Sequence, residues 1–511
     1  MQEFISQFWD DLDEYMEVSE KLENREIELA DYKAISTGFG SYPQRGGEKL
    51  MLRLRLTGGR LLPDQMKCIL ECCRLHHVDA LKISTGQSIQ LHDLSLEAVQ
   101  DIMPKMWNAG IITRGSGGDY PNNVMASPLS GVEKGEYFDV FPYAETAARY
   151  LMKYIDTKKF PRKLKVSFAN SEANIPHTSV RDLGFVANPD HTFQVYIAGG
   201  LGPNPKVGVL IDQHVQPKDI LYYVKTMITI FATYGNYESR NRARSRYLQD
   251  TLGEETLREL FHKNLKRYKE MKNHELHITP EVVEKSGQDI CEENTRIREQ
   301  KQEDLYYVSF HPIGGYLSLD QFAHLYQLIA PLNQVEIRLN PEGGLYVINC
   351  NAKEARLVYG ETTQGASDDF ESSIACVGQA KCAIGICDSQ ALLHKCIDAV
   401  KKEKFSNGVL PQMNISGCIS GCGSHQLAGL GFQGSRKRTE NGVKPAYIVY
   451  VGGCQEQYKE KMAVKVATLL EERIPAFLVE LGRTIQNAGS SYAEWYPDNK
   501  EVMENLIKKY E

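Results

Sequence analysis

The chain has 511 residues and a formal net charge of −7, with 59 Lys and Arg against 66 Asp and Glu. At roughly 150 residues per domain, this length predicts about three structural units and a core large enough to need no disulfides. The acidic balance disfavours a nucleic-acid partner, which would require a basic face. No stretch approaches the roughly 18 apolar residues of a membrane span, and the first residues do not resemble a secretory signal, so we expect a cytoplasmic protein with no membrane partner.

The first 31 residues form an acidic segment with an apolar stripe. They hold eleven acidic and two basic side chains, and the stripe has helical spacing at Phe4, Phe8, Leu12 and Tyr15. This amphipathic pattern predicts a surface helix that packs on the body of the protein. Docking to a partner is the alternative.

Two distant segments share one layout, MLRLRLTGGRLLPDQ followed by ALKISTGQSIQLHD, and YYVSFHPIGGYLSLDQ followed by VEIRLNPEGGLYVIN. Gly58 corresponds to Gly314, and Lys82 corresponds to Arg338, both at an offset of 256 residues. Each copy predicts a strand, a Gly-Gly turn, a helix and a second strand. Such an internal repeat fixes the architecture of a chain.

A second pair of segments is related more weakly. FPRKLKVSFANS and FQVYIAGGLG correspond to LPQMNISGCISGCG and YIVYVGGC, with Gly199 and Gly452 at an offset of 253 residues. The chain is therefore predicted to consist of two equivalent halves. Clefts usually form where such units meet, so we expect the functional site at their junction.

Basic residues alternate with apolar ones in two predicted strands. The period of two places Arg53 and Arg55 on one face of the first strand, and Lys163 and Lys165 on one face of the second. Neighbouring cations repel each other, which favours an anionic partner, either a polyanionic cofactor or a small oxyanion. A solvent-facing strand edge is the alternative.

The segment 240–302 is strongly charged, from SRNRARSRY to RIREQKQED. We expect it to be helical and to bridge the two halves through solvent.

Four of the twelve cysteines form two close pairs, Cys376-x5-Cys382 and Cys418-x3-Cys422, in glycine-containing runs. Four thiolates from two loops can hold a [4Fe–4S] cluster or a structural zinc ion. The five-residue gap of the first pair fits zinc poorly, because zinc pairs are usually two to four residues apart. A cluster is therefore favoured, with zinc or unligated cysteines as alternatives.

With the cysteine quartet, the duplication and the cationic strands together, residues 40–460 resemble the sirohaem-dependent nitrite/sulfite reductase family. The resemblance implies an α+β fold: a pseudo-two-fold duplicated scaffold with ferredoxin-like half-domains and two larger α/β domains. We accordingly expect an acidic helical arm over 1–39, a first half-domain over 40–115, a first sirohaem and substrate domain over 116–275, a helical linker over 276–302, a second half-domain over 303–362, and a [4Fe–4S]- and sirohaem-ligating domain with C-terminal helices over 363–511.

The resemblance also implies roles for individual residues. A [4Fe–4S] cluster would be held by Cys376, Cys382, Cys418 and Cys422, with Cys422 shared with the sirohaem iron. Electrons would come singly, from a ferredoxin-like donor. Arg55, Lys163 and Lys165 match the positions that bind and protonate the anion, and Lys82, Gln90 and Arg162 match positions that contact sirohaem.

Three positions depart from the family pattern. Asn122, which we expect to contact the cofactor, stands where an active-site Arg is expected, and Gly86 replaces another Arg. Ile419-Ser420 replaces the usual Pro-Asn of the second cysteine pair. Arg and Asn are not interchangeable at a bidentate anion site. Arg53, Arg114 or Arg181 would compensate, or the affinity or the substrate differs.

The expected reaction is a six-electron reduction of sulfite to sulfide or of nitrite to ammonia. A lysine at position 165 is similar to the pattern of sulfite reductases, whereas the first cysteine pair is similar to that of ferredoxin-nitrite reductases. Sulfite is slightly favoured. The alternatives are an electron carrier that lacks anion catalysis and a cobalamin-pathway oxygenase on the same scaffold.

Overall fold

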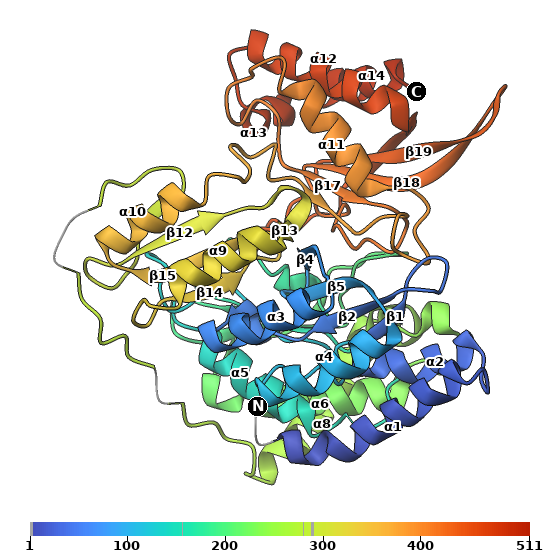
Figure 1. Cartoon of the computed structure of the whole chain (residues 1–511), viewed down its shortest axis with the longest axis vertical. Coiled ribbons are helices and arrows are strands. Elements are labelled where there is room, and N and C mark those ends of the chain that lie inside the picture. Colours follow the sequence, from blue (N-terminus) through green and yellow to red (C-terminus); the bar gives the residue numbers. More distant parts are fainter. Residues whose placement is uncertain (1–3, 156, 279–280, 288–290) are drawn as a thin grey trace.

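The computed structural model describes residues 4–155, 157–278, 281–287 and 291–511. Within them, four five-stranded sheets form two pairs, and the two members of each pair have the same connectivity. Figure 1 shows the half-domain sheets at the middle of the molecule and the C-terminal domain at one end. The predicted duplicated α+β scaffold is confirmed.

The two half-domains exchange a strand. The first sheet has the order β1-β2-β5-β4-β13 and the second β11-β12-β15-β14-β3, so β13 and β3 each join the sheet of the other copy. Helices α3, α4, α9 and α10 complete the half-domains. The bounds in the first copy are β1 Ser41–Pro43, β2 Leu50–Leu54, β3 Arg60–Leu61, α3 Pro63–Leu75, β4 Ala80–Ile83, β5 Ile89–Leu94 and α4 Leu96–Asn108, and in the second β11 Ile297–Glu299, β12 Tyr306–Phe310, β13 Tyr316–Ser318, α9 Leu319–Ile329, β14 Glu336–Leu339, β15 Leu345–Cys350 and α10 Ala352–Glu361.

The Gly-Gly turns make this exchange possible. Gly58 and Gly59 have φ values of 56° and 74°, in the left-handed region that favours glycine. A Cβ on Gly59 would stand 2.6 Å from the carbonyl oxygen of Leu339 in the other copy. Because the exchanged strands cross at this close approach, the two half-domains share one hydrophobic core.

The two larger domains repeat one sheet topology. In each sheet the first three strands are parallel and the last two antiparallel, over β6 to β10 and over β16 to β20. The bounds in the first are β6 Met125–Ala126, α5 Phe141–Met152, β7 Val166–Ala169, β8 Leu183–Ala187, β9 Phe193–Ile197, β10 Val209–Val215, α6 Ile220–Tyr234, α7 Leu248–Leu252 and α8 Glu254–Glu270, and in the second β16 Ile374–Ala375, α11 Ser389–Val400, β17 Met413–Ser416, β18 Leu430–Thr439, β19 Gly442–Val451, β20 Val464–Leu470, α12 Ile474–Asn487, α13 Tyr492–Trp495 and α14 Lys500–Lys509.

The N-terminal segment packs on the first half-domain as predicted. Its helices are α1 (Ile5–Glu23) and α2 (Leu29–Ser36). Phe8, Leu12 and Tyr15 are buried in the half-domain core, together with Phe4 just before the helix. Residues 1–3 of the predicted arm lie outside the described part. Among the described residues, every helix is too short or too polar to cross a bilayer.

The prediction of a helical linker over 276–302 is wrong for the part that the structure describes. Residues 276–278, 281–287 and 291–296 have no regular secondary structure, and β11 follows. Pro280, Gly287 and the many β-branched residues of this stretch have low helix propensity, which accounts for the difference. Upstream, the expected helix is present only over 248–270, as α7 and α8.

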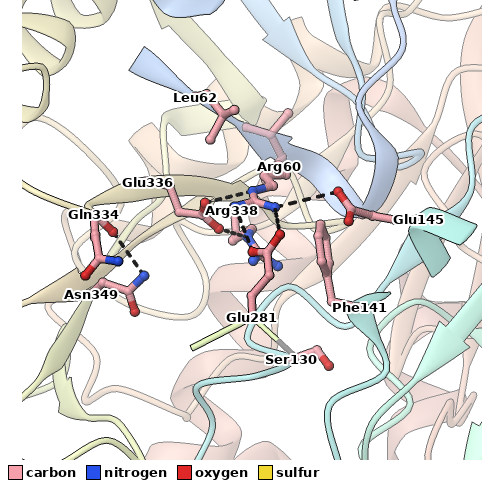
Figure 2. A network of polar contacts seen from close by, with 12 residues as sticks. Arg60, Leu62, Ser130, Phe141, Glu145, Glu281, Gln334, Glu336, Arg338 and Asn349 are labelled. Carbon is pink, nitrogen blue, oxygen red and sulfur yellow. Dashed lines mark hydrogen bonds and ion pairs between the residues drawn. The ribbon is translucent and has the colours of Figure 1, made fainter. Parts of the chain in front are cut away.

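Ion pairs join the exchanged strand β3 to three other parts of the chain (Figure 2). Arg60 on β3 contacts Glu336 on β14 at 2.8 Å, Glu145 on α5 at 3.6 Å and Glu281 of the linker at 3.2 Å. Arg338 donates to the same Glu336 at 2.5 Å. Burial alone would raise the pKa of Glu336, but Arg338 and Arg60 hold it below its usual value.

We expect Arg60→Met to lower the free energy of unfolding by about 2 kcal/mol at neutral pH, because buried Glu336 loses one of its two cations. The depressed pKa means that this stabilisation exists above the usual glutamate pKa and disappears as the pH falls through the folded-state value. The difference between the wild type and the variant in urea unfolding, followed by circular dichroism, should therefore shrink on acidification. Arg298→Met is the matched control, because Arg298 is exposed and its ion pair with Glu293 is long, at 3.7 Å. An equal effect of both variants would contradict this assignment.

Candidate functional site

The paired cysteines lie on two loops at one edge of the C-terminal sheet. Strands β16 and β17 are parallel neighbours, so the loops that follow them both begin at the carboxyl edge of the sheet, where ligands usually bind. There the backbone N–H of Gly417 donates to Sγ of Cys376 at 3.1 Å. A Cβ on Gly417 would stand 2.6 Å from the carbonyl oxygen of Cys387, so the glycine allows this close approach.

The two cysteine loops lie next to each other, and their thiols affect one another's pKa. Burial raises the pKa of the Cys422 thiol to about 12, and the thiols of Cys376, Cys418 and Cys382 raise it further. Burial also raises the pKa of Cys382, with contributions from Cys376 and Cys418. Since such interactions weaken with distance, the structure brings the predicted quartet together. Cys422 is the one member of the quartet whose residue keeps an exposed surface, although the surrounding protein atoms are dense enough to raise the pKa of its thiol.

The donor set suits an iron–sulfur cube better than a single zinc ion, because the gap between Cys376 and Cys382 is wider than that of the usual zinc pairs. Among the described residues, no group of three or more His, Cys, Asp or Glu side chains is arranged to hold a single metal ion. A zinc ion would draw four sulfurs to about 2.3 Å from its centre. A cube of irons and sulfides spaces its thiolates more widely, and backbone N–H groups at the sulfurs tune its potential. The quartet and its glycine-rich loops therefore fit a [4Fe–4S] cluster.

Two lysines adjoin the quartet. Lys163 and Lys165 are half-buried and flank the buried Leu164, just before β7. Burial lowers the pKa of Lys165 to about 7, with further lowering by Arg181 and Arg244, whereas Cys422 raises it. Burial, then Lys165 and Arg53, hold the pKa of Lys163 well below its usual value. Lys163 and Lys165 thus lie in a group of cations beside Cys422.

Arg244 is a member of this group that the sequence analysis missed. Its guanidinium donates to the buried carboxylate of Asp182 at 2.9 Å. Its charge also lowers the pKa of Lys163 and of Lys165. The segment 240–247 forms two short 3₁₀ turns and is not the solvated helix that we expected. The arginines of SRNRARSRY recur at every second residue. The same alternation of basic residues identified the two cationic strands, so it could also have pointed to Arg244.

Three polar residues form a row across the first half-domain sheet. Gln90 on β5 pairs in register with Arg53 on one side and with Lys82 on the other. The charge of Arg53 lowers the pKa of Lys163. At the other end of the row, the Nζ of Lys82 donates to the carbonyl oxygens of Gly314 and Ala375, the latter at 3.1 Å. Burial lowers the pKa of Lys82 to about 8, and Cys376 partly offsets this. The row connects the cationic group with the first cysteine loop.

Arg55 is buried, and its guanidinium bonds to backbone oxygens. Its two terminal nitrogens donate to the backbone oxygens of Pro121 and Asn122 at 3.0 and 2.9 Å. The Nδ2 of Asn122 donates to the Gly115 carbonyl at 3.2 Å. In this structure Arg55 therefore orders the loop before the cationic segment.

The other predicted cations divide between the site and the surface. Arg162 pairs with Asp119 at 2.7 Å, and Arg240 shares that carboxylate. Arg114 pairs with Asp11 of the N-terminal helix at 2.8 Å, so it does not replace a missing cation. Beside the position of Gly86, the Thr85 hydroxyl donates to the Cys422 carbonyl at 2.9 Å. Of the other candidates for compensation, Arg53 donates to the Ser116 carbonyl oxygen at 3.0 Å and Arg181 to the Pro176 carbonyl oxygen at 2.7 Å.

Comparisons with known proteins agree with this arrangement. Residues 42–106 match the family model described as the nitrite/sulfite reductase ferredoxin-like half domain. Residues 117–269 match the nitrite and sulphite reductase 4Fe-4S domain. That match falls on the first copy of the larger domain, whereas the cysteine quartet is in the second.

Similar proteins include reductases of both anions. The assimilatory ferredoxin-dependent nitrite reductase of Haloferax mediterranei is 24% identical over 493 residues, which cover 89% of this chain and 83% of that protein. The sulfite reductase [NADPH] hemoprotein beta-component of Geobacillus kaustophilus is 24% identical, covering 76% of this chain and 74% of that one. The structure of the Mycobacterium tuberculosis NirA protein superposes with a TM-score of 0.79 at 21% identity, over 94% of this chain and 92% of that one, which shows a common fold. The chain belongs to the nitrite and sulphite reductase family, oxidoreductases that use a [4Fe–4S] cluster and sirohaem.

Proposed function

We propose that this chain reduces sulfite to sulfide with six electrons, which arrive one at a time through a [4Fe–4S] cluster. The observation that carries the proposal is the group of cations beside Cys422, namely Lys163 and Lys165 with Arg181 and Arg244. Sulfite carries up to two negative charges and nitrite carries one. A dense cationic group therefore favours sulfite more strongly.

In this proposal Cys376, Cys382, Cys418 and Cys422 would hold the cluster, and Cys422 would also hold sirohaem. Sirohaem would supply the iron at which the anion is reduced. Lys82 and Arg162 would make charge-assisted hydrogen bonds to its carboxylates, and the Gln90 amide would donate to them. Asn122, whose backbone oxygen accepts from Arg55, would face the cofactor.

The lysines have two tasks. They hold the anion, and they supply protons as its oxygens become more basic during reduction. Without a proton for each electron, charge would accumulate in a low-dielectric site. A lysine whose pKa is near 7 exchanges protons readily at physiological pH, which suits Lys165 for this role. Burial, with Arg181 and Arg244 nearby, keeps the pKa of Lys165 low.

Nitrite reduction to ammonia is the second candidate. The nitrite reductase of Haloferax mediterranei and the chloroplastic ferredoxin–nitrite reductase of Betula pendula are both similar to this chain, at 24% and 26% identity. Their names, and the ferredoxin-dependent sulfite reductase of Mycobacterium tuberculosis at 23% identity, support a ferredoxin-type electron donor.

Replacing Lys165 tests the choice of anion. We expect Lys165→Asn to lower kcat/KM for sulfite about ten-fold relative to nitrite, the loss of one charge-assisted hydrogen bond. Initial rates with both anions, driven by reduced methyl viologen, measure the ratio. Lys153→Asn is the matched control, since Lys153 is an exposed lysine at the end of α5. An unchanged ratio would remove Lys165 as the determinant of substrate choice.

The low pKa of Lys165 predicts a pH dependence. With nitrite, whose charge is constant near neutrality, we expect kcat/KM to fall as the pH rises through about 7, because Lys165 loses its charge. Lys165→Arg keeps the charge and should flatten this fall. A fall that persists unchanged in Lys165→Arg would assign the titration to another group.

Replacing Cys422 tests cofactor binding directly. We expect Cys422→Ser, purified without oxygen, to lose the absorption of sirohaem and most of its iron. Cys454→Ser is the matched control, since Cys454 is partly buried and lies outside the quartet. Metal analysis and the electron paramagnetic resonance of the reduced protein give the readout. Full iron and sirohaem in Cys422→Ser would refute the shared thiolate.

A further inference from the structure

The outer hairpin of the two larger domains differs in length. In the first copy, β8 and β9 have five residues each, whereas β18 and β19 have ten residues each and stay paired to the end, from Leu430↔Val451 to Thr439↔Gly442. Figure 1 shows β18 and β19 reaching well beyond the C-terminal domain. The added length is rich in cations, of which Lys437 and Lys444 pair with Glu511 and Glu472 at 3.9 and 3.2 Å. Arg436 and Arg438 are the exposed cations of this segment.

The base of this hairpin clamps the loop that carries Cys382. Arg436 on β18 donates to the carbonyl oxygen of Ile386 at 3.1 Å and to the side-chain oxygen of Gln379 at 3.3 Å. From the opposite side, Arg45 in the turn between β1 and β2 donates to the carbonyl oxygens of Gln379 at 2.8 Å and Gly385 at 2.6 Å. Two guanidiniums from different domains therefore hold residues 379–386 in one conformation.

Apolar side chains project from this clamped loop. Ile384 is 64% exposed and Ile386 36% exposed, between the exposed cations Arg45 and Arg436. An exposed apolar centre with a charged rim is the usual composition of a protein interface. The chain as a whole carries −7, so the cations of this surface are a local reversal of sign that would attract an acidic protein.

The clamped loop carries one of the four cysteines. Cys382 lies within residues 379–386, to which Arg45 and Arg436 donate hydrogen bonds. An electron donor docked at this loop would therefore stand next to a ligand of the proposed cluster.

We propose that Arg45, Ile384, Ile386, Arg436 and Arg438, together called the hairpin face, dock the electron donor, a small acidic iron–sulfur protein. The inference rests on the proposed function, because it needs a cluster at Cys382. In each encounter the donor is oxidised by one electron and the cluster is reduced by one. The β18–β19 extension enlarges the contact and steers the donor toward the loop.

The test uses the holoenzyme with two reductants. A reduced acidic [2Fe–2S] ferredoxin requires docking, whereas reduced methyl viologen does not. We expect Arg438→Glu and Ile384→Gln each to raise the KM for ferredoxin at least ten-fold and to weaken its Kd, measured by calorimetry, by a similar factor. The viologen-driven rate should stay unchanged. Arg298→Glu is the matched control, because Arg298 is an exposed arginine on β11 and is not part of the hairpin.

Three outcomes would overturn the proposal: an unchanged KM and Kd, an equal loss of the ferredoxin- and viologen-driven rates, and binding at this face of a flavin-containing donor but not of ferredoxin. Raising the ionic strength should weaken ferredoxin binding to the wild type more than to Arg438→Glu. A holoenzyme that binds ferredoxin at the hairpin face but reduces neither anion with viologen would instead contradict the proposed function, so the two failures are distinguishable.

Discussion

Charges of like sign share one low-dielectric space in this protein, and the rest of the architecture follows from the need to balance them. Four thiols converge at the carboxyl edge of β16 and β17, and Lys163, Lys165, Arg181 and Arg244 gather beside them. Each group alone would be costly to bury. Together they offset each other, since Cys422 raises the pKa of Lys165 and Lys165 lowers that of Cys422. Bound cluster and anion would complete this balance.

The duplication places different side chains at equivalent positions of the two half-domains. In the first half-domain, Arg53, Gln90 and Lys82 lie in one row, and the row is completed by Tyr316 on the exchanged strand. The equivalent row of the second half-domain is Ser309, Tyr346, Arg338 and Arg60. There, Glu336, Glu145 and Glu281 neutralise the arginines, and Phe141 lies 3.8 Å from the Arg338 guanidinium. The same scaffold positions thus form a structural ion-pair network in one copy and face the cysteine loop in the other.

Strand exchange couples the two rows mechanically. Tyr316 and Gly314 come from the second copy, yet they line the end of the first row, where Lys82 donates to Gly314. A displacement of one half-domain would therefore move residues at both sites. The shared hydrophobic core makes such a displacement costly, which keeps the cations and the cysteine loops in register.

Patterns in the sequence determined the duplication, the Gly-Gly turns, the buried stripe of the N-terminal helix and the two cysteine pairs, because each is visible as a repeat or a spacing of residue types along the chain. Only the tertiary structure decided which cations face the quartet. Arg244 and Arg181 lie near Lys165, Arg114 pairs with Asp11, and Arg55 bonds to backbone oxygens. These outcomes depend on partners far away in the chain, and an arginine has the same local pattern whether its partner is a carboxylate, a carbonyl or an anion. The linker was mispredicted for a related reason, since charge density alone does not distinguish a helix from an extended segment that lies along the surface.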